Sequence, residues 1–122
     1  MKSEKKYLKI LDWCIVKYGM SRYYDDYPDL DINIEDVYGY SGEFDSDNNL
    51  ITIYDILIQM VDTTEIAIKT MIHEYQHYLQ DPKLCDAYFR DMLDSENPFE
   101  IEAEQIAQRD WKECYNDVKI HR

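Results

Sequence analysis

Positive charge is scarce in this 122-residue sequence, in which 13 lysines and arginines stand against 26 aspartates and glutamates and give a formal net charge of −13. Such an excess of negative charge repels phosphate backbones and anionic lipids, so we expect neither a nucleic-acid nor a membrane partner. The sequence also lacks an apolar run of transmembrane length and a charged leader followed by an apolar stretch and a cleavage site. We therefore expect a cytoplasmic protein.

Cysteine is also scarce. Cys14, Cys85 and Cys114 are odd in number and widely spaced, and no pair has the spacing of a zinc knuckle or a redox motif. We expect three reduced and mostly packed thiols. Because 45% of the residues are apolar and the chain is short, residues 1–122 should fold as a single domain.

The first half of the sequence predicts one helix and a small sheet. Apolar residues in 5–18 fall on one helical stripe that Gly19 is well placed to end. The stretch "DLDINIED", residues 29–36, alternates strictly between apolar and polar residues and predicts a half-buried strand. "GEF" and "LITIY" flank the polar turn cluster "DSDNN", which indicates a hairpin over about 43–54.

The second half predicts three helices. One should open at the capping-box spacing of Asp62 and Glu65 and run to about residue 80, where "DP" stops it. A shorter helix is expected over 83–93, and a last one over 97–118, with asparagine as its cap and proline at its first position. This order of elements predicts an α+β domain with about three strands.

The stretch "IHEYQH", residues 72–77, contains the candidate metal-binding and catalytic residues. His73 and His77 are two of only three histidines and lie one helical turn apart, so their rings can converge on one metal ion. Glu74 lies about a quarter turn from His73, where it can touch a metal-bound water without being a ligand. Apolar residues cover the opposite side of the helix, so the histidines can face a cleft. An accidental match on an ordinary helix is the competing interpretation.

A catalytic zinc ion needs a third protein ligand and an open position. His121 stands one residue from the end of the sequence, so a carboxylate of the last helix is expected, from Glu100, Glu102 or Glu104. Helical-wheel geometry does not choose among the three. Glu100 has capping-box spacing from Asn97 and can bond its backbone N–H, which gives Glu100 a structural role. Glu102 has no such role and is the favoured ligand.

These motifs resemble the active site of gluzincin metallopeptidases in their minimal single-domain form. "HEYQHYLQ" is similar to the HExxH helix, and "EAEQIA", residues 102–107, is similar to the stretch that supplies a glutamate ligand in ImmA/IrrE-type peptidases of bacteria and phages. The resemblance implies a zincin-like domain that binds Zn²⁺ through His73, His77 and Glu102, with Glu74 as the catalytic base. It implies hydrolysis of a peptide bond in a protein or peptide substrate.

The surroundings of this site give further expectations. Tyr88, Tyr115 or His121 could stabilise the oxyanion, and Glu104 could orient a histidine ligand. In zincins an edge strand beside the active-site helix pairs with the substrate, and "LITIY" is the expected equivalent.

The net charge of −13 is also compatible with an acidic binding protein that is not an enzyme. An acidic protein could mimic DNA, or act as an inhibitor, by occupying a basic site on a partner, and its zinc would then be structural or vestigial. Such a protein should carry its carboxylates as a stripe on one face. It has no need of Glu74 beside two convergent histidines, so the sequence favours the peptidase.

Overall fold

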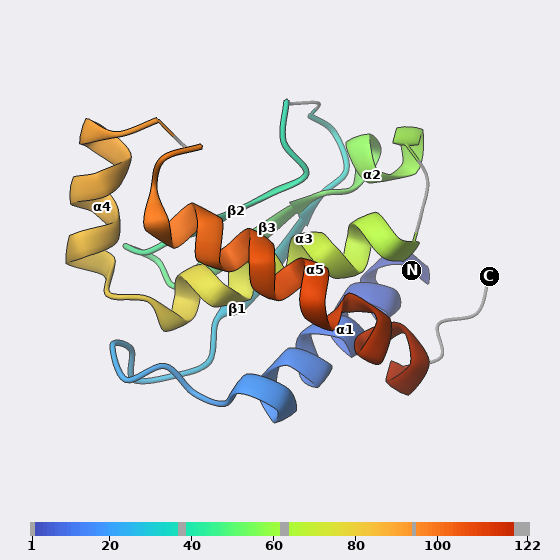
Figure 1. Ribbon diagram of the computed structural model, residues 1–122. Helices are drawn as coiled ribbons and strands as arrows, with labels where there is room; N and C mark the ends of the chain where they lie inside the picture. The colour runs from blue at the N-terminus through green and yellow to red at the C-terminus, as the bar shows by residue number, and fades with distance from the viewer. Residues whose placement is uncertain (1, 37–38, 62–63, 94, 119–122) are drawn as a thin grey trace.

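The computed structural model describes residues 2–36, 39–61, 64–93 and 95–118. Over these residues the chain forms an α+β domain, as the sequence predicted, with elements in the order α1 (Lys2–Tyr18), β1 (Asp29–Asn33), β2 (Gly42–Asp45), β3 (Leu50–Tyr54), α2 (Asp55–Val61), α3 (Thr64–Leu79), α4 (Pro82–Asp91) and α5 (Pro98–Val118) (Figure 1). None of the helices in these segments is long and apolar enough to cross a membrane.

The sheet places β3 at its centre, in the order β1-β3-β2. β1 is parallel to β3, and β2 is antiparallel to it, which confirms the expected hairpin. The expectation that "LITIY" forms an edge strand is wrong, because this segment is β3 and pairs on both sides. Ile51 and Ile53 of β3 are fully buried, as suits a central strand. The edge next to α3 is formed by β2 instead.

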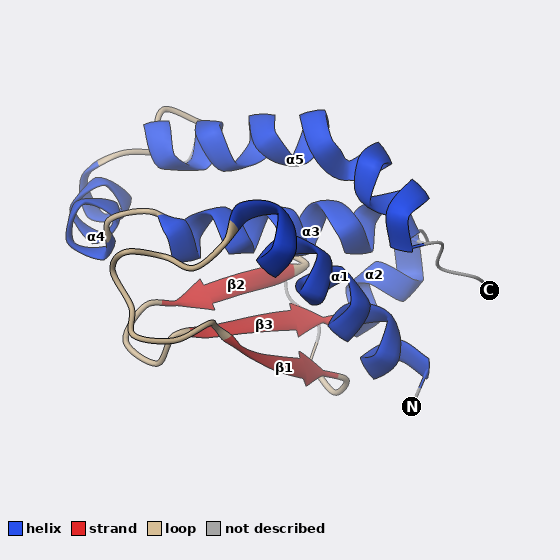
Figure 2. Cartoon of the chain, turned by 90° about the horizontal axis from the view of Figure 1, so that it is seen from below, coloured by secondary structure: helices blue, strands red, loops and turns tan. Residues whose placement is uncertain are grey.

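Helix α3 lies between the sheet and α5 (Figure 2). Its side chains Ile68, Met71, Ile72, Tyr75 and Tyr78 are fully buried, which confirms the apolar back expected from the sequence. Burial of five such large side chains is a main source of stability, at about 1.5–3 kcal/mol for each. The helix is therefore held rigidly, with its opposite side turned toward a cleft.

Helix α5 packs along α3 through a stripe of small and medium side chains. Ala103, Ala107, Asp110 and Cys114 of this stripe are buried and follow one another at spacings of four, three and four residues. Alternating steps of three and four keep a stripe on one side of a helix. Glu100 lies three residues before Ala103 and continues the stripe toward the start of α5.

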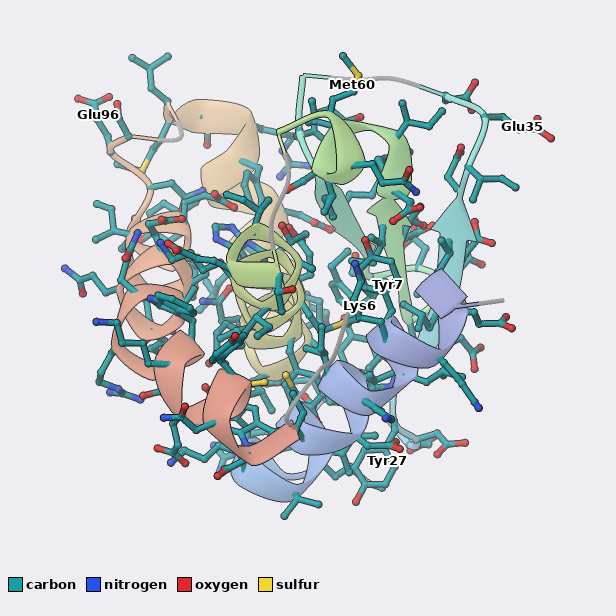
Figure 3. All side chains as sticks on the ribbon, turned by 90° about the vertical axis from the view of Figure 1, so that its right-hand side faces the viewer. Lys6, Tyr7, Tyr27, Glu35, Met60 and Glu96 are labelled. Carbon is teal, nitrogen blue, oxygen red and sulfur yellow. The ribbon has the colours of Figure 1, made fainter. Side chains whose placement is uncertain are left out.

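Helix α2 follows β3 without an intervening loop and was not expected from the sequence. Its first residue, Asp55, is buried and accepts hydrogen bonds from the Tyr7 hydroxyl, at 2.6 Å, and from the Gln59 amide. In Figure 3, Tyr7 lies between α1 and the strands, whereas Met60 of α2 projects outward. The Asp62 cap expected for the next helix lies outside the described residues, and α3 begins at Thr64.

Candidate metal centre

His73 and His77 project from α3 into one small cluster with Glu100 of α5. The two imidazole ring centres are 5.0 Å apart. One ligand atom from each of the three residues lies within 4.8 Å of the other two. His77 is buried, whereas His73 and Glu100 are partly buried, so part of the cluster is accessible to solvent. The sequence prediction that both histidines converge is consistent with this arrangement.

Glu100 faces both histidines with its two carboxylate oxygens. Its Oε2 lies 3.2 Å from His73 Nε2, and its Oε1 lies 2.6 Å from His77 Nε2. The second contact is not a well-directed hydrogen bond, because His77 Nε2 is buried and has no hydrogen-bond partner among the described residues. A cation held by both the imidazole nitrogen and the carboxylate oxygen would make this close approach favourable. The two imidazoles and the carboxylate therefore fit a divalent metal such as zinc.

The structure thus places Glu100 at the histidines where Glu102 was expected, so Glu100 replaces Glu102 as the candidate third ligand. The capping argument for Glu100 does not hold, because the Asn97 backbone N–H donates to the Leu93 carbonyl at 3.0 Å. Asn97 still caps the helix by accepting the Phe99 N–H at 2.9 Å. Glu100 is thereby free to turn toward α3.

The 3-4 spacing of small residues on α5 was the signal that could have identified Glu100. Extending that stripe backward from Ala103 and Ala107 reaches residue 100, whereas residue 102 lies one position off it. Glu102 is exposed, and one of its oxygens accepts a hydrogen bond from the Gln80 amide at 3.0 Å.

Each histidine also has a partner at its other ring nitrogen. Glu104 Oε2 lies 3.3 Å from His73 Nδ1, in line with the expectation that Glu104 orients a histidine. Gln80 Oε1 lies 2.7 Å from His77 Nδ1, and no role had been assigned to Gln80 from the sequence. Metal-binding histidines usually hold their second nitrogen in such a contact, which fixes the ring orientation. Both Nε2 atoms consequently face Glu100.

Within the cluster, the histidines and the carboxylates shift one another's pKa values toward the charged forms of His73 and Glu100. Burial opposes the charged form of His73, but the hydrogen bond to Glu100 and the nearby carboxylates outweigh it and raise the His73 pKa to about 9. Burial also opposes ionisation of Glu100, but its contacts with His73 and His77 lower the Glu100 pKa to about 2. The cluster is therefore an environment in which a positive charge, from a proton or a metal ion, is strongly favoured.

A cleft of about 820 Å³ opens in front of the cluster, and Glu74 lines it together with His73, His77 and Glu100. Only 8% of the Glu74 surface is exposed, and this burial raises the pKa of its carboxyl. Phe89 of α4 also lines the cleft, with its ring centre 5.7 Å from that of His77.

Strand β2 forms the wall of the cleft next to Glu74. The hydroxyls of Ser41 and Thr70 are 2.7 Å apart and tie the start of the strand to α3. Gly42 allows the close approach, since a Cβ atom there would lie 2.7 Å from Thr70 Cγ2 and 3.4 Å from Glu74 Cγ. The edge strand and the glutamate therefore share one boundary of the cleft.

The residues expected to stabilise an oxyanion are not found there. Tyr88 contacts the ring of Phe99, Tyr115 contacts the ring of Trp111, and neither is among the residues that line the cleft. His121 lies outside the described residues.

Comparison with known proteins identifies no relative: no protein family, no curated protein and no solved structure matches this chain significantly. The site is therefore characterised by its geometry, which shows a group of His73, His77 and Glu100 able to hold a metal ion.

Proposed function

We propose that the protein is a zinc-dependent metallopeptidase in which His73, His77 and Glu100 hold the zinc ion and Glu74 is the general base. The observation that carries the proposal is the convergence of two imidazoles and one carboxylate in a cleft that a further, buried glutamate also lines. Two histidines and a glutamate are the ligand set of a hydrolytic zinc site, which keeps one coordination position open.

The positions of the metal ligands and of Glu74 suggest the role of each in peptide hydrolysis. Bound zinc would supply a Lewis acid that lowers the pKa of a water molecule to about 7 and polarises the carbonyl of the scissile peptide. Glu74 takes a proton from the attacking water as the new C–O bond forms. It then gives that proton to the leaving amine as the C–N bond breaks. The raised pKa of the buried Glu74 carboxyl suits a group that must both accept and release a proton.

The edge of β2 supports a peptide as the substrate. Within the described part of the chain, β2 pairs with β3 on one side only, and residues Gly42 to Phe44 of β2 line the cleft. An extended peptide could bind along this edge by backbone hydrogen bonds, as in other proteins that bind substrates by adding a strand. This would bring its carbonyl groups past Glu74, which packs beside Gly42.

The substitution Glu74→Gln tests the proposal, because it removes the base and keeps the three metal ligands. We expect zinc content near one per chain in both proteins, measured by atomic absorption, and a loss of peptide hydrolysis of about 10²–10⁴-fold. Hydrolysis is followed by mass spectrometry on a mixture of peptides of many sequences. Glu113→Gln, far along α5 at the contact with Lys17, serves as the matched control and should retain both properties.

Two results would count against parts of this proposal. Unchanged hydrolysis by the Glu74→Gln protein would show that Glu74 is not the base. Stoichiometric zinc in a wild-type protein that cleaves no peptide would instead support an acidic binding protein with a structural metal.

A further inference from the structure

The side-chain amide of Gln80, just beyond the end of α3, connects three helices behind the candidate metal centre. Its nitrogen donates to the Phe99 carbonyl oxygen and to Glu102 Oε1, both at 3.0 Å. Its oxygen lies 2.7 Å from His77 Nδ1 and 3.3 Å from Cys85 Sγ. An amide has two donor hydrogens and two acceptor lone pairs, so every hydrogen-bonding position of Gln80 is used.

We propose that Gln80 is a positioning residue that sets the tautomer of His77, and that Glu102 holds Gln80 in the orientation this requires. The inference deepens the proposed metal site and rests on it for its functional meaning.

The orientation of the amide is decided by its partners on α5. A backbone carbonyl and an ionised carboxylate can only accept hydrogen bonds, so both must face the amide nitrogen. The amide oxygen of Gln80 is consequently turned toward α3 and α4. If the oxygen and nitrogen of the Gln80 amide were exchanged, the amide oxygen would face the Phe99 carbonyl oxygen and Glu102 Oε1, which are both acceptors. Gln80 is only 6% exposed, so these groups would lose hydrogen bonds that water could not replace.

The orientation of the amide in turn decides the state of His77. An amide oxygen accepts, so the neutral His77 ring must carry its hydrogen on Nδ1. The Nε2 lone pair then points toward Glu100, where a metal ion would bind. His77 is only 7% exposed, so bulk water cannot easily replace Gln80 as the partner of Nδ1.

The same amide also positions the third ligand. Phe99, whose carbonyl it binds, directly precedes Glu100 in the first turn of α5. Gln80 therefore fixes the distance between the end of α3, which carries His77, and the turn that carries Glu100. Glu102 thus has a place at the site behind a ligand, although it was expected to be the ligand itself.

The tautomer of His77 can be measured in metal-free protein by the ¹⁵N chemical shifts of its ring, at a pH at which the imidazole is neutral. We expect a single form with the hydrogen on Nδ1 in the wild type. In Gln80→Met the methionine fills similar space but cannot accept a hydrogen bond, so the two tautomers should become mixed. Gln76→Met is the matched control, since Gln76 is equally buried on α3 and its amide nitrogen has no partner among the described residues.

Zinc affinity gives the second measurement, by competition with a chromophoric chelator. Loss of an outer partner of a metal-binding histidine should raise the zinc Kd of Gln80→Met by about 10–100-fold. Glu102→Ala should give a smaller increase, because the Phe99 carbonyl still holds the amide. Glu102→Gln should be close to the wild type, because its side-chain oxygen can accept the same hydrogen bond.

The outcomes separate this inference from the proposed function. A wild-type protein that binds no zinc would contradict the proposed metal site. The His77 tautomer in metal-free protein would still show whether Gln80 sets it. An unchanged tautomer in both Gln80→Met and Glu102→Ala, or a zinc Kd within twofold of the wild type in both, would overturn the inference. Glu102 is exposed, so Glu102→Ala should fold even if Gln80→Met does not, and an unchanged tautomer together with an unchanged zinc Kd in Glu102→Ala alone would then overturn the inference.

Discussion

Glu100 and Glu102 are two positions apart on one helix and therefore point to different sides of it. The Glu100 carboxylate faces the Nε2 atoms of both histidines, whereas Glu102 faces the Gln80 amide. The same chemical group would thus be a metal ligand at position 100 and would support a ligand at position 102. What distinguishes the two is their place relative to the stripe that packs against α3.

This difference leads to a prediction about two isosteric substitutions. Glu100→Gln replaces a charged ligand by a neutral amide, so zinc binding should weaken by more than the ~10–100-fold expected for an outer partner. Glu102→Gln should leave the zinc Kd within a few-fold of the wild type. Equilibrium dialysis with zinc measures both. Retention of zinc by Glu100→Gln together with its loss from Glu102→Gln would restore Glu102 as the ligand.

The sequence could predict the histidines because a spacing of four residues on one helix fixes their relation without reference to the rest of the fold. Glu100 and Gln80 could not be predicted in the same way. Their roles depend on how α5 is rotated against α3, and the capping pattern at Asn97 offered Glu100 a local partner that it does not use. A local pattern was thus outweighed by packing between helices.

At the scale of elements, α1 and α5 are joined by polar side chains above the apolar core. The Tyr18 hydroxyl donates to Asp110 at 2.7 Å, and the Trp13 indole N–H donates to Asp117 at 2.8 Å. Asp110 is also bonded by its neighbour Arg109, at 2.8 Å. Because Asp110 belongs to the stripe that packs on α3, these bonds help to hold α5 at the rotation that the metal site requires.

Asp110 should therefore make stability depend on pH. The hydrogen bonds from Arg109, which outweigh the effect of burial, and from Tyr18 lower the Asp110 pKa in the folded protein. The unfolded value is about 3.9, so the stabilisation is complete above that pH and is lost as the pH falls through the lower folded value.

We expect Asp110→Asn to lower the free energy of unfolding by about 1.5–3 kcal/mol at pH 7, because it weakens hydrogen bonds to a charged group. The difference from the wild type should shrink below pH 4. Urea unfolding at pH 7, 5 and 3 measures it, with the exposed Asp12→Asn of α1 as a control. A difference that stays constant from pH 7 to pH 3 would show that the charge of Asp110 contributes nothing.

The elements themselves were predicted with unequal success, for physical reasons. The hairpin and the three longer helices carry strong periodic patterns and turn residues, and the structure confirms them. Helix α2 begins at Asp55 directly after β3, with no glycine or proline to mark the boundary. The order of the strands was not predicted, because β1 and β3 are separated in the sequence by β2 and a local pattern does not show which strands pair.

For the whole molecule, a metal ion bound by two residues of α3 and one residue of α5 would link these two helices. A ligand that binds only the folded state stabilises it by about 4 kcal/mol at 1,000 times its Kd. We expect zinc at that excess to raise the midpoint of thermal unfolding by roughly 10–20 °C, measured by circular dichroism. Glu100→Gln should abolish most of this increase, and a wild-type midpoint that does not respond to zinc would contradict a site that spans both helices.

One edge of β2 has no strand partner among the described residues, and this has a consequence for concentrated solutions of the protein. An edge that can accept a peptide can also accept the same edge of another copy, and unpaired strands are common starting points of self-association. Here the strand has only four residues, and two of them, Glu43 and Asp45, are acidic. Two copies would also bring together net charges of −13 each, whose repulsion weakens as salt shortens the Debye length to about 8 Å. The acidity of the chain would thus keep two β2 edges apart at low ionic strength. We expect the protein to be most prone to self-association at high ionic strength.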